Sequence, residues 1–255
     1  MKRFLIISCI AIALLASSCK KDKNPVTPGA TTSSLTLKFE HNWGTESFRF
    51  GQSYISASND TITPTLLRYY ISNIKITQTD GTVWSEPESY HLVDYTNAIN
   101  GVVTFTIPDV PAGDYKALSY LIGVDSVRNY SGAQTGALDP ANGMFWTWNS
   151  GYIFFKFEGN TPQAQAGKCA YHIGGFTAPF IGSRPFSTTF NGDLVKATPA
   201  SAPQVHLSLD VSKLFSGVHS WDIDTTNSVV HMPNANSVIL ADNMQSMFGF
   251  EHIHN

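Results

Sequence analysis

Histidine is the residue type that offers the most chemistry in this sequence of 255 residues. Neutral imidazole is a ligand for copper, zinc and nickel. Several histidines lie at the ends of expected strands beside glycine or asparagine, where a side chain can face the rim of a fold, among them His41 and His172. A single histidine is more often a surface or hydrogen-bonded residue, so position alone does not select a ligand. The full set is His41, His91, His172, His206, His219, His231, His252 and His254, of which the last two lie on one side of an extended segment.

Motifs of the common catalytic machineries are absent from the sequence. There is no G-x-S-x-G elbow, no P-loop, no H-E-x-x-H and no paired C-x-x-C. No carboxylate pair has a local spacing that suggests glycoside hydrolysis, although a fold can assemble such pairs. We therefore expect a protein that is not an enzyme. Open coordination positions on a bound copper are invisible in a sequence, so an enzymatic role for copper stays open.

A dense aromatic segment occupies the middle of the chain, with Trp146 and Trp148 two residues apart. Here the sequence resembles the MbnP-like copper-binding proteins, relatives of the methanotroph MopE/CorA surface proteins. The resemblance covers most of residues 35–255 and is most specific in the run GMFWTWNSGY. It rests, in chain order, on residues 67–74, 123–125, 144–152, 172–175 and 241–244.

The resemblance implies a copper site held largely by histidines and assisted by an oxidised tryptophan, a kynurenine. His172 matches the family's histidine–glycine motif and is the first expected ligand, with His41, which follows the first strand, as the second. Trp146 and Trp148 match the aromatic motif, so each is a candidate for the oxidised ring near the metal. Methanotroph members have a cysteine soon after the motif, whereas Cys169 precedes it here and is either a buried small hydrophobe or a soft ligand. The implied partner is a di-haem cytochrome c peroxidase-like protein, which performs the oxidation.

The first residues have the features of a lipoprotein signal. Lys2 and Arg3 precede an apolar run over residues 4–15, which is too short to remain as a membrane-spanning helix. The run LASSC resembles a lipobox, in which the thiol of Cys19 takes a lipid; a plain secretory signal is the alternative. We expect a signal peptide over residues 1–18, a lipidated cysteine and flexible tether over 19–34, and one domain over 35–255. The lipid would anchor the protein in the bacterial cell envelope, on the periplasmic or surface face of the outer membrane.

The elements that must position these side chains are mostly strands. Residues 35–39 alternate apolar and polar side chains, as a half-buried strand does. Further strands are predicted over residues 66–77, 90–95, 102–107, 115–122, 152–158, 170–173 and 205–209. Gly, Asn, Asp and Pro between them favour hairpins, so we predict an all-β fold, an antiparallel β-sandwich of Ig-like or jelly-roll-like type. We also predict a helical turn over 210–215 and a C-terminal helix over 236–250 at the edge of the sandwich, capped by Asn234 or Asn236.

The composition excludes two classes of protein. A chain that is 42% hydrophobic with a net charge of −3 is not intrinsically disordered. With 16 Lys and Arg against 19 Asp and Glu, it has no excess of positive charge for a nucleic-acid backbone. The expected function is that of an envelope lipoprotein that binds copper for its acquisition or handling. The alternatives are a metal-independent surface module that binds a glycan or a protein through exposed aromatic rings, and a structural or adhesive envelope protein.

Overall fold

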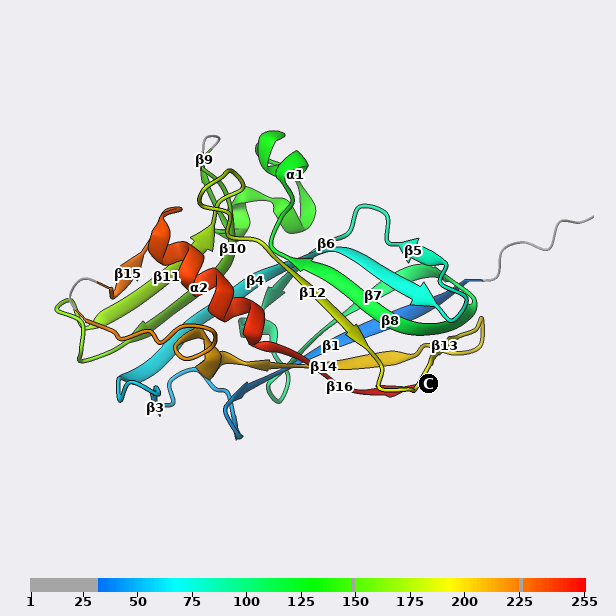
Figure 1. Ribbon diagram of the computed structural model, residues 1–255, viewed down its shortest axis with the longest axis horizontal. Helices are drawn as coiled ribbons and strands as arrows, with labels where there is room; N and C mark the ends of the chain where they lie inside the picture. Colours follow the sequence, from blue (N-terminus) through cyan, green and yellow to red (C-terminus); the bar gives the residue numbers. More distant parts are fainter. Residues whose placement is uncertain (1–31, 148–149, 225–226) are drawn as a thin grey trace, which may run out of the picture.

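The computed structural model describes residues 32–147, 150–224 and 227–255 (Figure 1). Cys19 and Trp148, two residues singled out in the sequence, lie outside this part of the chain. The strands are β1 (Thr32–Trp43), β2 (Glu46–Ser47), β3 (Tyr54–Ile55), β4 (Thr61–Gln78), β5 (Val83–Ser85), β6 (Tyr90–Asp94), β7 (Val102–Pro111), β8 (Gly113–Ile122), β9 (Phe145–Thr147), β10 (Gly151–Asn160), β11 (Lys168–Gly174), β12 (Arg184–Thr189), β13 (Val195–Ala197), β14 (Gln204–Asp210), β15 (Val229–Val230) and β16 (Phe248–His254). The helices are α1 (Ser126–Tyr130) and α2 (Ala235–Ser246), with 3-10 turns η1 (Tyr95–Asn97), η2 (Gly136–Leu138), η3 (Pro140–Asn142) and η4 (Val211–Leu214).

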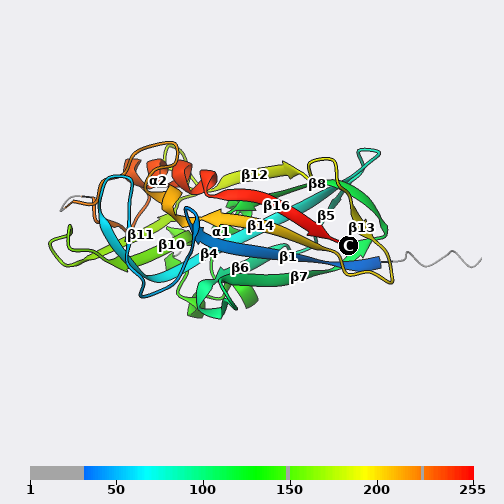
Figure 2. The ribbon, with the colours of Figure 1, turned by 90° about the horizontal axis from the view of Figure 1, so that it is seen from below.

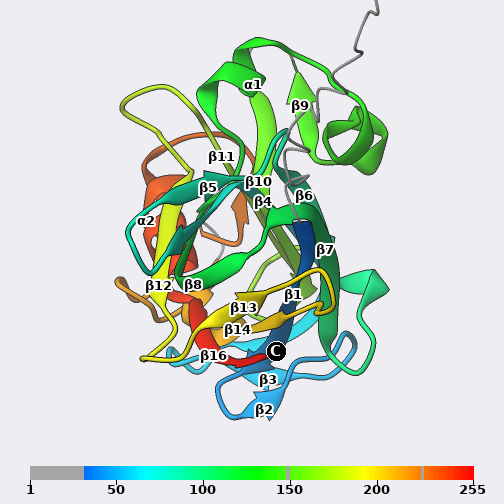
Figure 3. The ribbon, with the colours of Figure 1, turned by 90° about the vertical axis from the view of Figure 1, so that its right-hand side faces the viewer.

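Two sheets form the fold, which confirms the predicted all-β sandwich. The smaller sheet has the order β16-β14-β1-β2, with β7 also paired to β1, and Figure 2 shows its long strands side by side. The larger sheet has the order β12-β8-β4-β10-β11-β15, with the shorter strands attached to β4, β8 and β10. Figure 3 looks along the molecule, with β1 and β14 in one layer and β4 and β10 in the other. Pairing is antiparallel throughout the described strands except for β1 with β14 and β11 with β15, which run parallel.

The main core lies between the two sheets and follows the period-2 pattern of the strands. On β1 every second residue is buried: Leu35, Leu37, Phe39, His41 and Trp43. From the larger sheet, Tyr69 on β4 meets Phe39 edge to face at 6.0 Å between ring centroids. Burial of such rings supplies most of the favourable free energy of a β-sandwich. His41 thus occupies an inward position within a run of apolar side chains.

A second, smaller apolar cluster lies outside this core. It gathers the segment between β8 and β10 against the other face of β4 and β10, and its buried members are Tyr70, Val124, Leu138, Met144, Tyr152, Ile153 and Phe154. Trp146 of β9 is half-buried against this cluster. The backbone oxygens of Asn142 and Gly143 accept hydrogen bonds from Arg68 on β4 and Lys156 on β10, at 3.0 and 3.2 Å. These contacts tie the segment before Trp146 to the outer face of the larger sheet.

The predicted C-terminal helix is shorter in the structure than in the sequence analysis. Asn234 caps α2 and forms a capping box with Ser237, as predicted for one of the two candidate asparagines. The helix ends at Ser246, and the residues from Phe248 onward form β16, which pairs with β14. Gly249 and the aromatic residues on either side of it lower helix propensity, and the open edge of β14 offers backbone partners. The strands β12 and β13 were likewise not predicted. Within the described residues, α1 and α2 are both too short to cross a bilayer.

Candidate metal centre

His172 lies on the outward face of the larger sheet. Along β11 the side chains of Cys169, Tyr171 and Ile173 are buried in the main core, so His172 between them points to the opposite face. The register of β10 with β11 places Lys156 opposite His172, and Glu158 one pair further along on the same face. Alternation on one strand therefore brings a half-buried imidazole beside a lysine and a carboxylate.

A second imidazole reaches His172 through the parallel pairing of β11 with β15. Tyr171 pairs with Val230, so the next residue, His231, lies beside His172. The two imidazole rings stack with centroids 4.4 Å apart and planes at 21°. His231 was among the histidines of the sequence but was not selected as a ligand. The strand β15, which precedes His231, lies far along the chain from β11, so local spacing in the sequence does not indicate this pairing.

A carboxylate orients the ring of His172. Its Nε2 lies 2.8 Å from Oε1 of Glu158, so this nitrogen carries the proton that is donated to the carboxylate. The hydrogen bonds of the described residues leave Nδ1 of His172 and both ring nitrogens of His231 without a protein partner. A carboxylate that accepts from one nitrogen of an imidazole and fixes its tautomer is the usual support of a metal-binding histidine. Nδ1 of His172 is therefore the nitrogen free to bind an ion.

The electrostatic surroundings keep His172 in its neutral form. Burial lowers the pKa of His172 below its usual value, and the positive charge of Lys156 and the neighbouring His231 act in the same direction. The hydrogen bond to Glu158 raises the pKa of His172, but by less than these effects lower it. Partial burial raises the pKa of Glu158, but the hydrogen bond from His172 and the charge of Lys156 outweigh it, so that the net pKa is lowered. At neutral pH the pair is an unprotonated imidazole and a carboxylate, which is the state that binds a metal.

Trp146 lies on the same face, next to the histidine pair along β11. Gly174 follows His172 by two residues and therefore faces the same way, and the six-membered ring of Trp146 covers it. A Cβ atom at Gly174 would lie 2.6 Å from Cζ3 of Trp146, so only glycine permits this approach. The structure thus brings together two residues that the sequence analysis selected, His172 and Trp146, from β11 and β9.

His41 does not join this centre, contrary to the ligand pair expected from the sequence. It is 2% exposed in the main core, on the opposite side of the larger sheet from His172. Its Nδ1 donates to the carbonyl of Gly101 at 3.0 Å, and its Nε2 accepts from the hydroxyl of Tyr69 at 3.1 Å. Burial lowers the pKa of His41 to about 4. With both nitrogens engaged, His41 has the environment of a structural core histidine.

Cys169 also faces away from His172. Its side chain is buried in the main core, and burial raises the pKa of its thiol to about 12. A thiol must lose its proton to bind a metal well. Of the two alternatives for this residue, the structure agrees with the buried small hydrophobe.

Three further imidazoles meet on the smaller sheet, at His206, His252 and His254. The alternation of His252 and His254 was visible in the sequence, but His206 joins them only through the pairing of β14 with β16. A helix was predicted over part of β16, so this pairing was not predicted from the sequence.

The MbnP family model matches residues 32–233, well over half of the chain. Among solved structures, the chain is similar to MbnP from Methylosinus trichosporium, with a TM-score of 0.55, 15% sequence identity, and coverage of 86% of this chain and 98% of that chain. At this identity the likeness supports the fold alone. No curated protein sequence matches the chain. His172, His231 and Trp146 lie within the matched residues, whereas His252 and His254 follow them.

Proposed function

The chain belongs to the MbnP family, and from that premise we propose that it binds copper at His172 and His231. The observation that carries the proposal is the stacked pair of imidazoles beside Trp146, on residues that lie inside the family match. Imidazole suits copper, and Nδ1 of His172 together with the nitrogens of His231 supplies the donors. Copper bound here would be accessible to solvent on the outward face of the larger sheet, since His231 is exposed.

The residues around the pair fit a metal in three respects. Glu158 fixes the tautomer of His172, which is the role of an outer carboxylate at a metal site. Lowered proton affinity at His172 keeps the ligand available at neutral pH. Trp146 excludes water from the backbone at Gly174 and places an oxidisable indole ring two residues from the ligand.

We propose further that Trp146 or Trp148 is converted to kynurenine by a di-haem cytochrome c peroxidase-like partner. The protein is proposed to be a lipoprotein anchored through Cys19 to the outer membrane, and to handle copper rather than to catalyse a reaction. These points rest on the family and on the first residues of the sequence. A peptide that contains both tryptophans, isolated from protein made with and without the partner, would report the mass change of the oxidation.

The test of the copper site is a stoichiometry measurement on untagged protein. Protein loaded with Cu(I) is titrated with a chromophoric chelator, for wild type and for the His172→Ala/His231→Ala variant. The double variant is expected to hold one copper ion fewer than wild type. His219→Ala, which removes an exposed imidazole hydrogen-bonded to Asp242, is the matched control and should leave the copper content unchanged.

The proposal is wrong if the double variant retains the full copper content with the wild-type affinity. Circular dichroism of both variants shows whether a loss of copper reflects the ligands or the fold. Glycan or protein binding that survives both chelation and the double substitution would instead favour a metal-independent surface module.

A further inference from the structure

The smaller sheet carries a second group of imidazoles, and its strand register explains how they meet. His206 on β14 pairs directly with His252 on β16, and His254 follows two residues later on the same face of β16. The rings of His206 and His252 stack with centroids 4.1 Å apart, and that of His254 lies edge-on to both, at 5.0 and 4.9 Å. Three donors from two adjacent strands thus share one patch of the sheet.

The donor atoms are close to the spacing that one metal ion needs. One ligand atom from each histidine lies within 4.8 Å of the others, and Nε2 of His252 is 3.2 Å from Nε2 of His254. Two nitrogens bound to one zinc ion at about 2.0–2.1 Å are at most about 4.2 Å apart. The side chains of His252 and His254 are exposed, so small rotations can bring nitrogens that are up to 4.8 Å apart to the distance that one zinc ion requires.

His206 is held in the orientation of a ligand before any ion arrives. Its Nδ1 lies 2.5 Å from Oε1 of Glu40 on the neighbouring strand β1, so Nδ1 carries the proton and Nε2 carries the lone pair. This Nε2 is buried and has no hydrogen-bond partner among the described residues. A buried acceptor without a partner is costly, and a bound metal would satisfy it. The cation nearest to His206 in the register is Lys38, which lies on β1 and pairs with His206 on β14.

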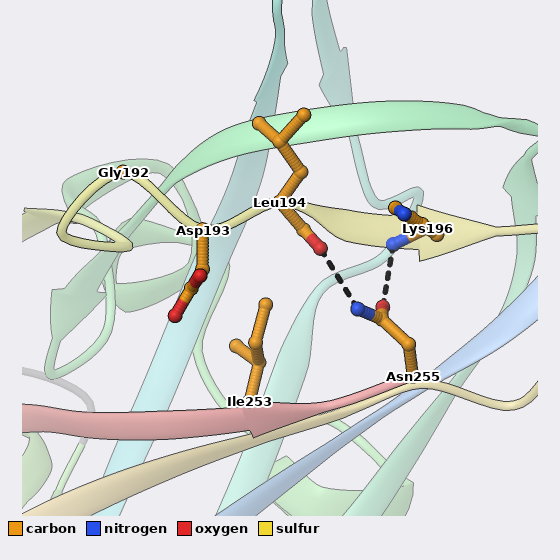
Figure 4. A pocket seen from close by; sticks show the side chains of 6 residues that line it. All are labelled: Gly192, Asp193, Leu194, Lys196, Ile253 and Asn255. Carbon is orange, nitrogen blue, oxygen red and sulfur yellow. Dashed lines mark hydrogen bonds between the residues drawn. The ribbon is translucent and has the colours of Figure 1, made fainter.

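The strand that carries the two exposed histidines is fixed at its end. The side chain of Asn255 donates to the carbonyl of Leu194 at 3.0 Å and accepts from the backbone N–H of Lys196 at 2.7 Å (Figure 4). Ile253, between the two histidines, points into the pocket that these residues line (Figure 4). The backbone of β16 is therefore anchored, while the imidazoles on its other face stay free to adjust.

We propose that His206, His252 and His254 form a second metal site, which takes a divalent first-row transition metal ion such as Zn²⁺ or Cu²⁺. Three neutral imidazoles with an open position are the donor set that these ions prefer. The site belongs to the smaller sheet, whereas His172 and His231 lie on the larger one, and His252 and His254 follow the residues of the family match. The proposal is therefore independent of copper binding at His172.

The test counts zinc ions on untagged protein, because a polyhistidine tag would bind the same metals. Equilibrium dialysis against Zn²⁺ alone is compared for wild type, His252→Ala/His254→Ala and His172→Ala/His231→Ala. The first variant removes exposed side chains and should lose one zinc ion while its urea unfolding midpoint stays the same. The second variant should keep that ion, and His219→Ala should match wild type.

A positioning role for Glu40 gives a second measurement. Glu40→Ala should weaken zinc binding at this site by about 10- to 100-fold, as for other outer carboxylates, and Glu40→Gln, which keeps an acceptor, should recover part of the loss. In proton NMR, zinc should shift the imidazole signals of all three histidines. The proposal is overturned if His252→Ala/His254→Ala binds zinc as wild type does, or if zinc leaves the His206 signals unchanged.

Discussion

Replacing His41 by glutamine should remove a large part of the acid sensitivity of this protein. The imidazole is 2% exposed, donates to Gly101 and accepts from Tyr69, and its pKa is lowered from 6.5 to about 4 by burial. In the unfolded chain the same imidazole takes up a proton near its ordinary pKa. Between these two values the unfolded state binds more protons, so the free energy of unfolding falls as the pH falls.

The size of the effect follows from the two pKa values. Since a tenfold change in proton affinity corresponds to about 1.4 kcal/mol, a pKa lowered from 6.5 to about 4 corresponds to about 3 kcal/mol. This contribution is fully present above pH 6.5 and is lost progressively down to pH 4, below which the slope disappears. Glutamine can donate to Gly101 and accept from Tyr69 without titrating, so His41→Gln should lack this slope.

The assay is urea unfolding followed by tryptophan fluorescence, at steps from about pH 7.5 to about pH 4. The measured quantity is the difference in pH dependence between wild type and His41→Gln, because the lowered pKa of His172 adds a slope of the same sign to both proteins. His219→Gln, at an exposed position, is the control. Equal slopes in wild type and His41→Gln would refute the assignment of His41 as a neutral core residue. His41→Gln should also bind as much copper as wild type.

Two further predictions concern residues on β11. Gly174→Ala should destabilise the protein by about 1–3 kcal/mol and change the fluorescence of Trp146, because the new methyl group would lie 2.6 Å from both the indole and the backbone oxygen of Tyr152. Wild-type stability and emission in this variant would contradict the close approach. The peptide that contains Cys169 should remain unlabelled when native protein is treated with iodoacetamide at pH 8, because the thiol is buried with a pKa of about 12. The same peptide should become labelled in urea. Rapid labelling of the native protein would contradict this prediction by showing that the thiol is accessible.

The sequence predicted local features of this fold better than contacts between distant strands. The alternation over residues 35–39 identified β1, and continued by two residues it places His41 inward, where it lies in the structure. The strand was predicted to end at Phe39, and this end point made His41 look like a rim residue. Period-2 patterns fix the face of a side chain only as far as the strand is followed.

Among the candidate ligands, too, those in local motifs were predicted and those brought together by distant strands were not. His172 and Trp146 were identified from motifs, which are local in the sequence, and the structure brings them to one face. His231 reaches His172 through a parallel strand pair that links residues far apart in the chain. The three histidines of the smaller sheet meet through the register of β14 with β16. Part of β16 had been predicted as helix because Phe248 continues the helical stripe of the residues before it. Short apolar runs do not distinguish the two periods.

The parallel pairing of β1 with β14 has a consequence for how the chain folds. β7 pairs with one edge of β1, but the other edge is completed only when Gln204, much further along the chain, meets Thr36. Closing so long a loop is slow, and topologies rich in such contacts fold slowly. Until β14 arrives, β1 presents an open row of backbone donors and acceptors to any strand nearby, including one from another copy of the chain. The unpaired edge of β1 is therefore the part of the folding chain that most needs protection by a chaperone.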